Sequence, residues 1–264
     1  MIRYPSFVFR ALYRYLDRWD KHHQLIFMNY GYSEPGVSVP MDEMDEKNRF
    51  TTQLYHHMAE MTDLKDKEVV EVGSGRGGGL AYIARKFQPA SAVGIDLEKS
   101  VVAFSNKFHQ LPNLNFITGD AQKLPLGDNS CDVVLNVESS HRYSSLKTFF
   151  KEVHRVLRPD GYFLYTDFRD SYKWPSLLTL LNEQGFKVIE ERDISSNILH
   201  SLDLDSERRA SLVKKYAPKM LQKSILNFTG SKGTATYDYF LKGKFTYKSF
   251  MIQKNGDGRH LSQL

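Results

Sequence analysis

The chain lacks several features that define large classes of proteins. It has 264 residues but a single cysteine, Cys131, so it cannot form an internal disulfide. No apolar run approaches the roughly 20 residues that a membrane-spanning helix needs. Residues 1–19 carry an arginine or an acid every few positions, and so lack the apolar core of a signal peptide. These absences lead us to expect a cytoplasmic protein.

The charge is small in total but unevenly distributed. The formal net charge is +5, whereas the segment from Asp205 to the end holds twelve Lys or Arg and four Asp or Glu, which leaves it at +8. A basic flank of this kind suits an acidic partner, either nucleic acid or an anionic membrane surface. The alternative is a solvated face that keeps the protein soluble.

The stretch EVVEVGSGRGGG, residues 68–79, organises the rest of the chain. Val69, Val70 and Val72 indicate a buried parallel strand, and the glycines that follow indicate a tight loop. Residues 80–87 have helical spacing, so this loop joins a strand to a helix. Open α/β sheets bind nucleotide-like ligands at such a loop, at the carboxyl edge of the strands.

Strands and helices alternate along the next hundred residues. Strands are predicted at 68–73, 91–96, 114–118, 131–137 and 161–167, with a clear helix beginning at Leu146 and ending at a Pro-Asp-Gly stop. A sixth strand is predicted after Gly185, and the alternating residues 243–254 read as an antiparallel edge strand. The pattern predicts a doubly wound, mostly parallel, seven-stranded α/β sheet.

This reading divides the chain into five parts. We expect an N-terminal helical cap (1–62), a ligand-binding domain (63–195), a helical insertion (196–240), the final strand (241–253) and a polar tail (254–264). Residues 1–28 are predicted to form an amphipathic helix rich in aromatic and basic residues, which could contact a membrane, cover an apolar pocket or pack on the sheet domain. The cap and the insertion are predicted to form a substrate lid.

Three acids at predicted strand ends indicate the ligand. Glu71 precedes the loop G-x-G-x-G by two residues, where a carboxylate suits an ammonium group better than a pyrophosphate. Asp96 ends the second strand and can accept both hydroxyls of a ribose, and Asp120 can accept the exocyclic amine of an adenine. An amino acid, a ribose and an adenine together make S-adenosylmethionine. The alternative is an NAD-type or other nucleotide-binding fold.

The order EVGSGRGGG, VGIDL, GDAQKLPLGDNSCDVV, LRPDGYF resembles the class I S-adenosylmethionine-dependent methyltransferases over residues 67–170. NYGYSE (29–34) and NVESSHRY (136–143) resemble small-molecule and lipid O-methyltransferases, most closely the phthiotriol/phenolphthiotriol dimycocerosates methyltransferase group. The resemblance implies a Rossmann-like methyltransferase fold, with S-adenosylmethionine as cofactor and S-adenosylhomocysteine as product.

The resemblance also implies donor contacts by position. They are Glu71, Gly73, Ser74 and Gly75 at the methionine moiety, Asp96 and Leu97 at the ribose, Asp120 and Ala121 at the adenine, and Asn136 and Val137 beneath the methyl group. In the families it resembles, an aromatic residue near position 30 closes over the donor, which makes Tyr30 and Tyr32 candidates.

Two residues are candidates for the chemistry of methyl transfer. An aliphatic hydroxyl is a poor nucleophile while protonated, so a base must stand at the carboxyl end of the middle strands. His141 follows the fourth predicted strand and Asp167 ends the fifth, and sequential strands usually lie side by side. We expect His141 to be the general base and Asp167 its orienting carboxylate or a second hydroxyl ligand. The alternative is that His141 only shapes the pocket and that proximity of donor and acceptor is sufficient. Phe168 follows Asp167 where a magnesium-dependent catechol enzyme would need a second ligand, so no metal is expected.

The sequence thus predicts an O-methyltransferase that acts on a hydroxyl of a hydrophobic small molecule, polyketide or lipid. The alternatives are a C-methyltransferase of a sterol- or quinone-like acceptor, a nucleic-acid methyltransferase, or a binding module without catalysis. Amino-methylating base enzymes commonly carry N/D-P-P-Y/F after the fourth strand, where this chain has NVES, and this disfavours nucleic acid as a partner. Intact Glu71, Asp96 and Asp120 disfavour the binding module.

Overall fold

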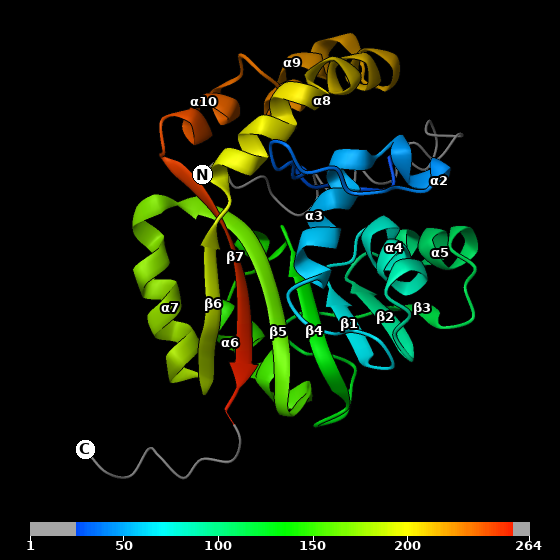
Figure 1. Ribbon diagram of the computed structural model, residues 1–264, viewed down its shortest axis with the longest axis vertical. Helices are drawn as coiled ribbons and strands as arrows, with labels where there is room; N and C mark the ends of the chain where they lie inside the picture. Colours follow the sequence, from blue (N-terminus) through cyan, green and yellow to red (C-terminus); the bar gives the residue numbers. More distant parts are fainter. Residues whose placement is uncertain (1–24, 256–264) are drawn as a thin grey trace.

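The computed structural model describes residues 25–255 and is built around one seven-stranded sheet. The strands follow the spatial order β3-β2-β1-β4-β5-β7-β6 (Figure 1). Their bounds are Glu68–Val72 (β1), Ser91–Asp96 (β2), Leu114–Thr118 (β3), Cys131–Val137 (β4), Leu157–Asp170 (β5), Phe186–Asp193 (β6) and Phe245–Lys254 (β7). The predicted class, an α/β sheet of mostly parallel strands, is confirmed.

Some helices connect the strands, and others lie beyond one end of the sheet. They are Glu43–Glu46 (α2), Arg49–Ala59 (α3), Gly78–Lys86 (α4), Lys99–Phe108 (α5), Leu146–Val156 (α6), Trp174–Glu183 (α7), Ser195–Tyr216 (α8), Gln222–Phe228 (α9) and Ala235–Leu241 (α10). Short 3-10 turns lie at Ser140–Arg142 (η1), Ser171–Lys173 (η2) and Lys219–Leu221 (η3). Residues 1–24 of the predicted basic aromatic helix lie outside the described residues.

The strand order places a topological switch point between β1 and β4. Strand β1 pairs in parallel with β2 on one side, with Val69 opposite Ala92, and with β4 on the other, with Val69 opposite Val133. The chain first winds outward from β1 to β3 and then returns to start β4 beside β1. In such sheets the crevice at the carboxyl ends of the two central strands binds the ligand.

Strand β7 is antiparallel, as predicted, but it is not an edge strand. It lies between β5 and β6 and pairs antiparallel with both, so that β6 is the edge. The alternation of polar and apolar residues that indicated an exposed edge arises because polar side chains of β7 have polar partners on neighbouring elements. Thr246 accepts a hydrogen bond from the Trp174 indole at 2.7 Å, and Lys248 pairs with Glu191 on β6. These polar side chains of β7 thus pair with residues of α7 and β6.

Strand β5 is longer than the predicted range 161–167. Helix α6 ends at Val156, and Leu157 already pairs with Cys131 of β4. The Pro-Asp-Gly sequence expected to stop the helix lies within the strand, where the register with β4 shifts and Asp160 adopts a φ of 62°. It therefore makes a bulge, in which a short polar residue tolerates the left-handed conformation.

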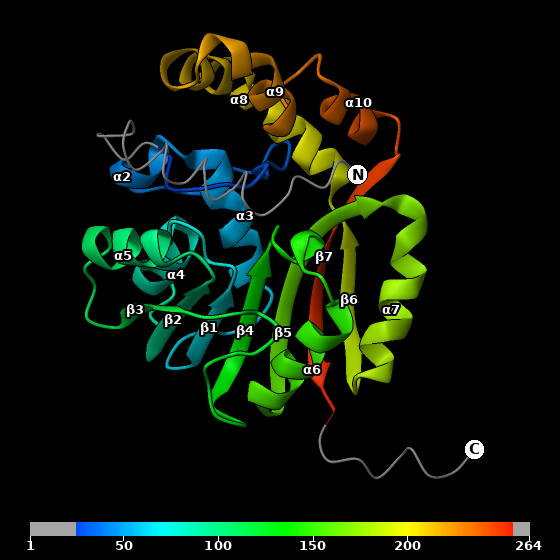
Figure 2. The ribbon, with the colours of Figure 1, turned by 180° about the vertical axis from the view of Figure 1, so that it is seen from behind.

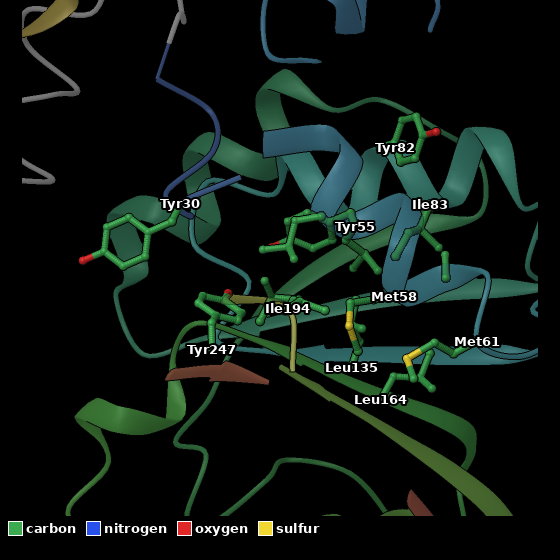
Figure 3. Packing of buried hydrophobic residues seen from close by; sticks show 14 of the residues in the cluster. Tyr30, Tyr55, Met58, Met61, Tyr82, Ile83, Leu135, Leu164, Ile194 and Tyr247 are labelled. Carbon is green, nitrogen blue, oxygen red and sulfur yellow. The ribbon is translucent and has the colours of Figure 1, made fainter. Parts of the chain in front are cut away.

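Alternate residues of the central strands face two separate cores. Val69 belongs to a core that includes residues of α3 and α4, and Val70 belongs to a second core that includes residues of α6 and α7. Figure 2 shows α6 in front of the sheet. On the first face, Tyr55 and Met58 of α3 lie against Leu135 and other strand residues (Figure 3). Both faces are covered by helices, which is why β1 and β4 are rich in valine.

Helices α8, α9 and α10 form a helical insertion, residues 195–241, beyond the carboxyl ends of the strands (Figure 1). The insertion lies in the same position in the sequence as the predicted range 196–240. In the described part of the chain, no helix combines the length and the apolar character needed to cross a bilayer.

The core predicts one measurable stability effect. Phe150 of α6 is fully buried and contacts Phe163 and Tyr165 of β5. We expect Phe150→Ala to lower the free energy of unfolding by about 3–5 kcal/mol, because it leaves a cavity between helix and sheet. Tyr172→Ala is the control, since Tyr172 is 77% exposed and should change stability by less than about 0.5 kcal/mol. Equal effects in urea titrations of the two variants would contradict this assignment of the core.

Candidate active site

A cavity of about 600 Å³ lies at the carboxyl ends of β1, β2 and β4. One side is made by the glycine loop after β1 and the residues that end β2 and β3. The other side is made by the segment that enters the domain, the η1 turn and the helical insertion. Ten of the predicted site residues line it: Tyr30, Gly73, Ser74, Gly75, Asp96, Leu97, Asp120, Ala121, Val137 and His141.

Asp96 is held rigidly at the centre of the predicted donor side. One carboxylate oxygen accepts the Gly75 amide at 2.9 Å, and the other accepts the Glu98 amide at 3.0 Å. Burial raises the pKa of this carboxyl, and the two amides oppose that rise because they bind the charged form. A carboxylate fixed in this way has oxygen lone pairs left to accept the two hydroxyls of a ribose.

The glycine loop approaches the turn after β4 so closely that a side chain would not fit. Gly73 has a φ of 80°, and a Cβ atom there would lie 2.4 Å from Ser139 Oγ. Asn136 holds this contact from below, because its Nδ2 donates to the Val72 carbonyl at 2.7 Å and to Ser139 Oγ at 2.7 Å. Asn136 is fully buried and supports the loop; it does not line the cavity.

Glu71 also lies beneath the loop and not in the cavity. Alternation along β1 directs it to the α3 face, where Tyr55 Oη donates to its Oε1 at 2.7 Å. Burial raises the pKa of this carboxyl to about 8. Its Oε2 has no partner within the described residues. Tyr55 and Ser74 line the cavity instead, and Ser74 Oγ is likewise buried without a described partner.

Of the two candidate tyrosines, the structure places Tyr30 at the cavity and Tyr32 away from it. Tyr32 stacks on His57 with the ring centroids 4.4 Å apart and donates to Glu34. Tyr30 is buried and meets Phe168 edge-on at 5.2 Å. The reason is local, because Gly31 has a φ of 83° and turns the chain between the two rings.

His141 and Asp167 form a buried pair at the acceptor side. Nδ1 of His141 lies 2.8 Å from Asp167 Oδ1, and the His141 backbone amide donates to Oδ2 at 2.9 Å. Asp167 does not line the cavity, so its place is behind the imidazole. Nε2 of His141 has no hydrogen-bond partner among residues 25–255, and the ring lines the cavity.

The surroundings fix the charge on each member of this pair. Burial lowers the pKa of His141 and outweighs the opposite effect of Asp167. The pKa of Asp167 falls to about 2 despite burial, because His141, Arg169 and the Ser140 hydroxyl all stabilise the carboxylate. At neutral pH the pair is therefore a neutral imidazole beside a carboxylate, and Nδ1 carries the proton.

Glu138 lies in the NVESSH motif but is not among the predicted site residues. Glu138 is buried, has a φ of 46° and lines the cavity. Its Oε1 accepts the Tyr30 amide and the Tyr247 hydroxyl, each at 2.7 Å. Burial raises the pKa of this carboxyl to about 8. Glu138 thus connects the segment that enters the domain to the β4 end and to β7.

The helical insertion is joined to the same segment. Arg209 of α8 is buried, pairs with Asp205 at 2.9 Å and donates to the Tyr30 carbonyl at 3.0 Å. The same guanidinium donates to the Thr229 carbonyl at 3.1 Å. The hydroxyl of Tyr30 donates to the Phe228 carbonyl at 3.2 Å. Arg209 and Tyr30 therefore hold the insertion over the cavity.

The acceptor side of the cavity is largely aromatic. Its apolar wall is made by Phe27, Tyr30, Phe168, Phe228, Tyr239 and Phe245. Arg142 of η1 also lines this part, with its guanidinium carbon 5.9 Å from the centroid of the Phe228 ring. Such a wall binds apolar groups, and the residues that form it come from four distant parts of the sequence.

The sequence matches known methyltransferases over nearly its whole length. A family described as "Methyltransferase domain" matches residues 70–165. The chain is 41% identical to the fatty-acid O-methyltransferase of Mycolicibacterium smegmatis over 246 residues, covering 93% of this chain and 89% of the relative. It is 36% identical to the phthiotriol/phenolphthiotriol dimycocerosates methyltransferase of Mycobacterium tuberculosis, covering 94% of this chain and 92% of the relative.

The chain belongs to the class I S-adenosylmethionine-dependent methyltransferases. Solved structures of this fold agree with the architecture. A putative sarcosine dimethylglycine methyltransferase from Galdieria sulphuraria superposes with a TM-score of 0.70 at 18% identity, covering 93% of this chain and 97% of that one. A geranyl diphosphate C-methyltransferase from Streptomyces coelicolor, in complex with Mg²⁺, geranyl diphosphate and S-adenosyl-L-homocysteine, gives 0.67 at 15% identity, covering 93% and 97%.

The cavity fits the donor that this family uses. Asp96 and Asp120 present carboxylates at the ends of two neighbouring strands, and the buried Ser74 hydroxyl adds a polar group in the loop. In the described part of the chain, no group of three or more His, Cys, Asp and Glu could hold a metal ion. One side of the cavity therefore presents carboxylates and backbone amides, where we expect the donor, and the other presents aromatic rings and one imidazole, where we expect the acceptor.

Asp96 provides a direct test of the donor side. We expect Asp96→Ala to weaken S-adenosylmethionine binding about 10- to 100-fold, since it removes charged hydrogen bonds to the ribose and releases the Gly75 amide. Isothermal calorimetry measures the change. Asp128→Ala is the control, because Asp128 is exposed and does not line the cavity. Unchanged affinity in Asp96→Ala would place the donor elsewhere.

The raised pKa of Glu138 leads us to expect that this residue affects how the stability of the protein depends on pH. A folded-state pKa of about 8 lies above that of an unfolded glutamate, so the folded protein binds the extra proton and loses stability as pH rises from about 4.5 to 8. Glu138→Gln keeps an oxygen acceptor for Tyr30 and Tyr247 without that cost. We expect the variant to be more stable than the wild type at pH 9, and closer to it at pH 5. Lower stability of the variant at both pH values would show that Glu138 is ionised when folded.

Proposed function

We propose that this methyltransferase transfers the methyl group to a hydroxyl of a lipid or another hydrophobic acceptor, with His141 as general base. The observation that carries the proposal is the buried His141–Asp167 pair, with Nδ1 on the carboxylate and Nε2 free of described partners at the cavity. The aromatic wall supports an apolar acceptor. The names of the two relatives, a fatty-acid and a phthiotriol-type methyltransferase, support a lipid.

S-adenosylmethionine supplies an electrophilic methyl group on a sulfonium. The protein aligns the acceptor and removes its proton. Neutral His141 accepts the hydroxyl proton at Nε2, and Asp167 stabilises the imidazolium that forms by accepting the hydrogen bond from Nδ1. Asp167 stays ionised throughout, because Arg169 and Ser140 also bind it. The helical insertion, held through Arg209 and Tyr30, acts in this proposal as a lid that excludes water from the cavity.

A second acceptor, a carboxylate, is favoured by one observation. Arg142 lines the cavity on the acceptor side, where a guanidinium can orient an acid, and one relative is named a fatty-acid O-methyltransferase. A carboxylate is already ionised at neutral pH and needs no base. The two acceptors therefore differ in their dependence on His141, and one experiment separates them.

The general base predicts a large loss of activity on hydroxyl acceptors. We expect His141→Ala to lower kcat about 10²- to 10⁴-fold with fatty alcohols and phenols, and to leave donor affinity unchanged. Radiolabelled methyl transfer to a panel of alcohols, phenols and fatty acids measures both. His200→Ala on α8 is the matched control, because His200 does not line the cavity. Full activity of His141→Ala on fatty acids alone would identify a carboxylate acceptor.

The pair also predicts the acid limb of the pH profile. Activity requires neutral His141, whose pKa burial lowers below its usual value of about 6.5, so kcat should fall only as pH drops below about 6.5. Asp167→Asn should lower kcat at every pH, because an amide neither fixes the Nδ1–H tautomer nor stabilises the imidazolium. An acid limb that persists unchanged in His141→Ala would assign it to another group.

A further inference from the structure

The connection between α8 and α9 forms an exposed tip of the helical insertion. This insertion tip, residues 214–223, contains the 3-10 turn Lys219–Leu221. Met220 is 94% exposed and Leu221 is 51% exposed, although both are large apolar side chains. The tip projects from the end of the molecule that carries the cavity, away from the amino ends of the strands (Figures 1 and 2).

The two apolar side chains stand among lysines. Lys214, Lys219 and Lys223 are exposed, and none of them forms a salt bridge within the described residues. Residues 208–237 contain seven Lys or Arg and no Asp or Glu. Arg208 and Arg209 pair with Asp205 inside the insertion, so the exposed positive charge of this stretch lies largely at its tip.

An exposed methionine alone does not indicate a binding surface. Met44 of α2 is 63% exposed, but Glu43, Asp45 and Glu46 surround it in sequence. Single apolar residues on a surface are ordinary. The insertion tip differs because two adjacent exposed apolar side chains occur in the same short segment as Lys214, Lys219 and Lys223, which form no salt bridge with a described residue. Peripheral proteins use this combination at the boundary between lipid headgroups and acyl chains.

We propose that the insertion tip binds the surface of an anionic membrane. Met220 and Leu221 enter the headgroup region, and the surrounding lysines bind lipid phosphates. A nucleic acid would satisfy the lysines, but it would leave Met220 and Leu221 in water, so the exposed apolar pair favours the lipid surface.

The position of the tip connects this surface to the cavity. Helix α9 begins beside Leu221, and its other end contributes Asn227 and Phe228 to the cavity wall. A membrane contact at the tip therefore brings the acceptor side of the cavity close to the bilayer. This step rests on the proposed function: a cavity of 600 Å³ has the size of a site for one drug-sized ligand, so donor and reactive end fill it while a long chain stays in the membrane.

Vesicle co-sedimentation of the full chain tests the proposal. The probes are vesicles of equimolar phosphatidylglycerol and phosphatidylcholine, and vesicles of phosphatidylcholine alone. We expect binding to the anionic vesicles only, with Met220→Ser/Leu221→Ser weaker by about tenfold. The affinity of Lys219→Glu/Lys223→Glu for the anionic vesicles should fall about fivefold or more for each lysine, and the difference should shrink as the salt concentration rises. The matched controls are Met44→Ser and Lys65→Glu/Lys67→Glu, which should bind as the wild type.

Several results would overturn the proposal. Equal binding by Met220→Ser/Leu221→Ser and the wild type would assign any membrane contact to another segment, such as residues 1–28. Loss of binding in Met44→Ser to the same extent would show a non-specific effect. Binding of single-stranded RNA that is unaffected by the serine variant, without binding to vesicles, would make the tip a nucleic-acid surface.

A second readout separates this inference from the proposed function. Met220→Ser/Leu221→Ser should raise KM about tenfold for an acceptor embedded in anionic vesicles, while kcat and KM for a short, water-soluble acceptor stay unchanged. If no acceptor is methylated, the proposed function fails but the vesicle binding still stands or falls by itself. If methylation proceeds and vesicle binding is absent, the membrane surface is wrong and the enzyme activity is not.

Discussion

The parallel pairing of β1 with β4 is the constraint on which the site depends. Because Val69 lies opposite Val133, both strands end at the same level, and the glycine loop after β1 meets the turn after β4. Gly73 fits against Ser139 only because it lacks a side chain. Asn136 ties the two ends together through the Val72 carbonyl. The side of the cavity expected to bind the donor and the side expected to bind the acceptor thus meet between β1 and β4, where the strand order of the sheet reverses.

Buried charge organises the acceptor side. Asp167 is fully buried and ionised, and a buried carboxylate is tolerated only when it is well paired. Asp167 contacts His141, Ser140 and Arg169, and these contacts hold the imidazole in one orientation. Glu138 shows the contrasting case, since burial outweighs the hydrogen bonds from Tyr30 and Tyr247 and the charge of Arg209, and raises the pKa of this carboxyl to about 8. These two neighbouring carboxyl groups thus differ in charge because their surroundings differ.

The sequence was most informative where local pattern and tertiary structure agree. The strands at 91–96, 114–118 and 131–137 were predicted to the residue, because each is a short apolar run between turn residues. The position of β7 could not be predicted, since polar residues such as Lys248 resemble an exposed edge until a partner on β6 is known. The same limit applies to Tyr30 and Tyr32, which have similar contexts in sequence and are separated by the turn at Gly31.

By itself, the sequence determined the fold class, the family, the donor and the placement of Asp96 and His141 at strand ends. These follow from periodicity and from glycine and acid spacing, which are local in the chain. Only the tertiary structure decided that Glu71 and Asn136 support the loop from below, that Glu138 joins Tyr30 to Tyr247 at the cavity and that Met220 and Leu221 stand exposed among lysines. Those properties depend on contacts and exposure between segments far apart in sequence, and no local pattern encodes them.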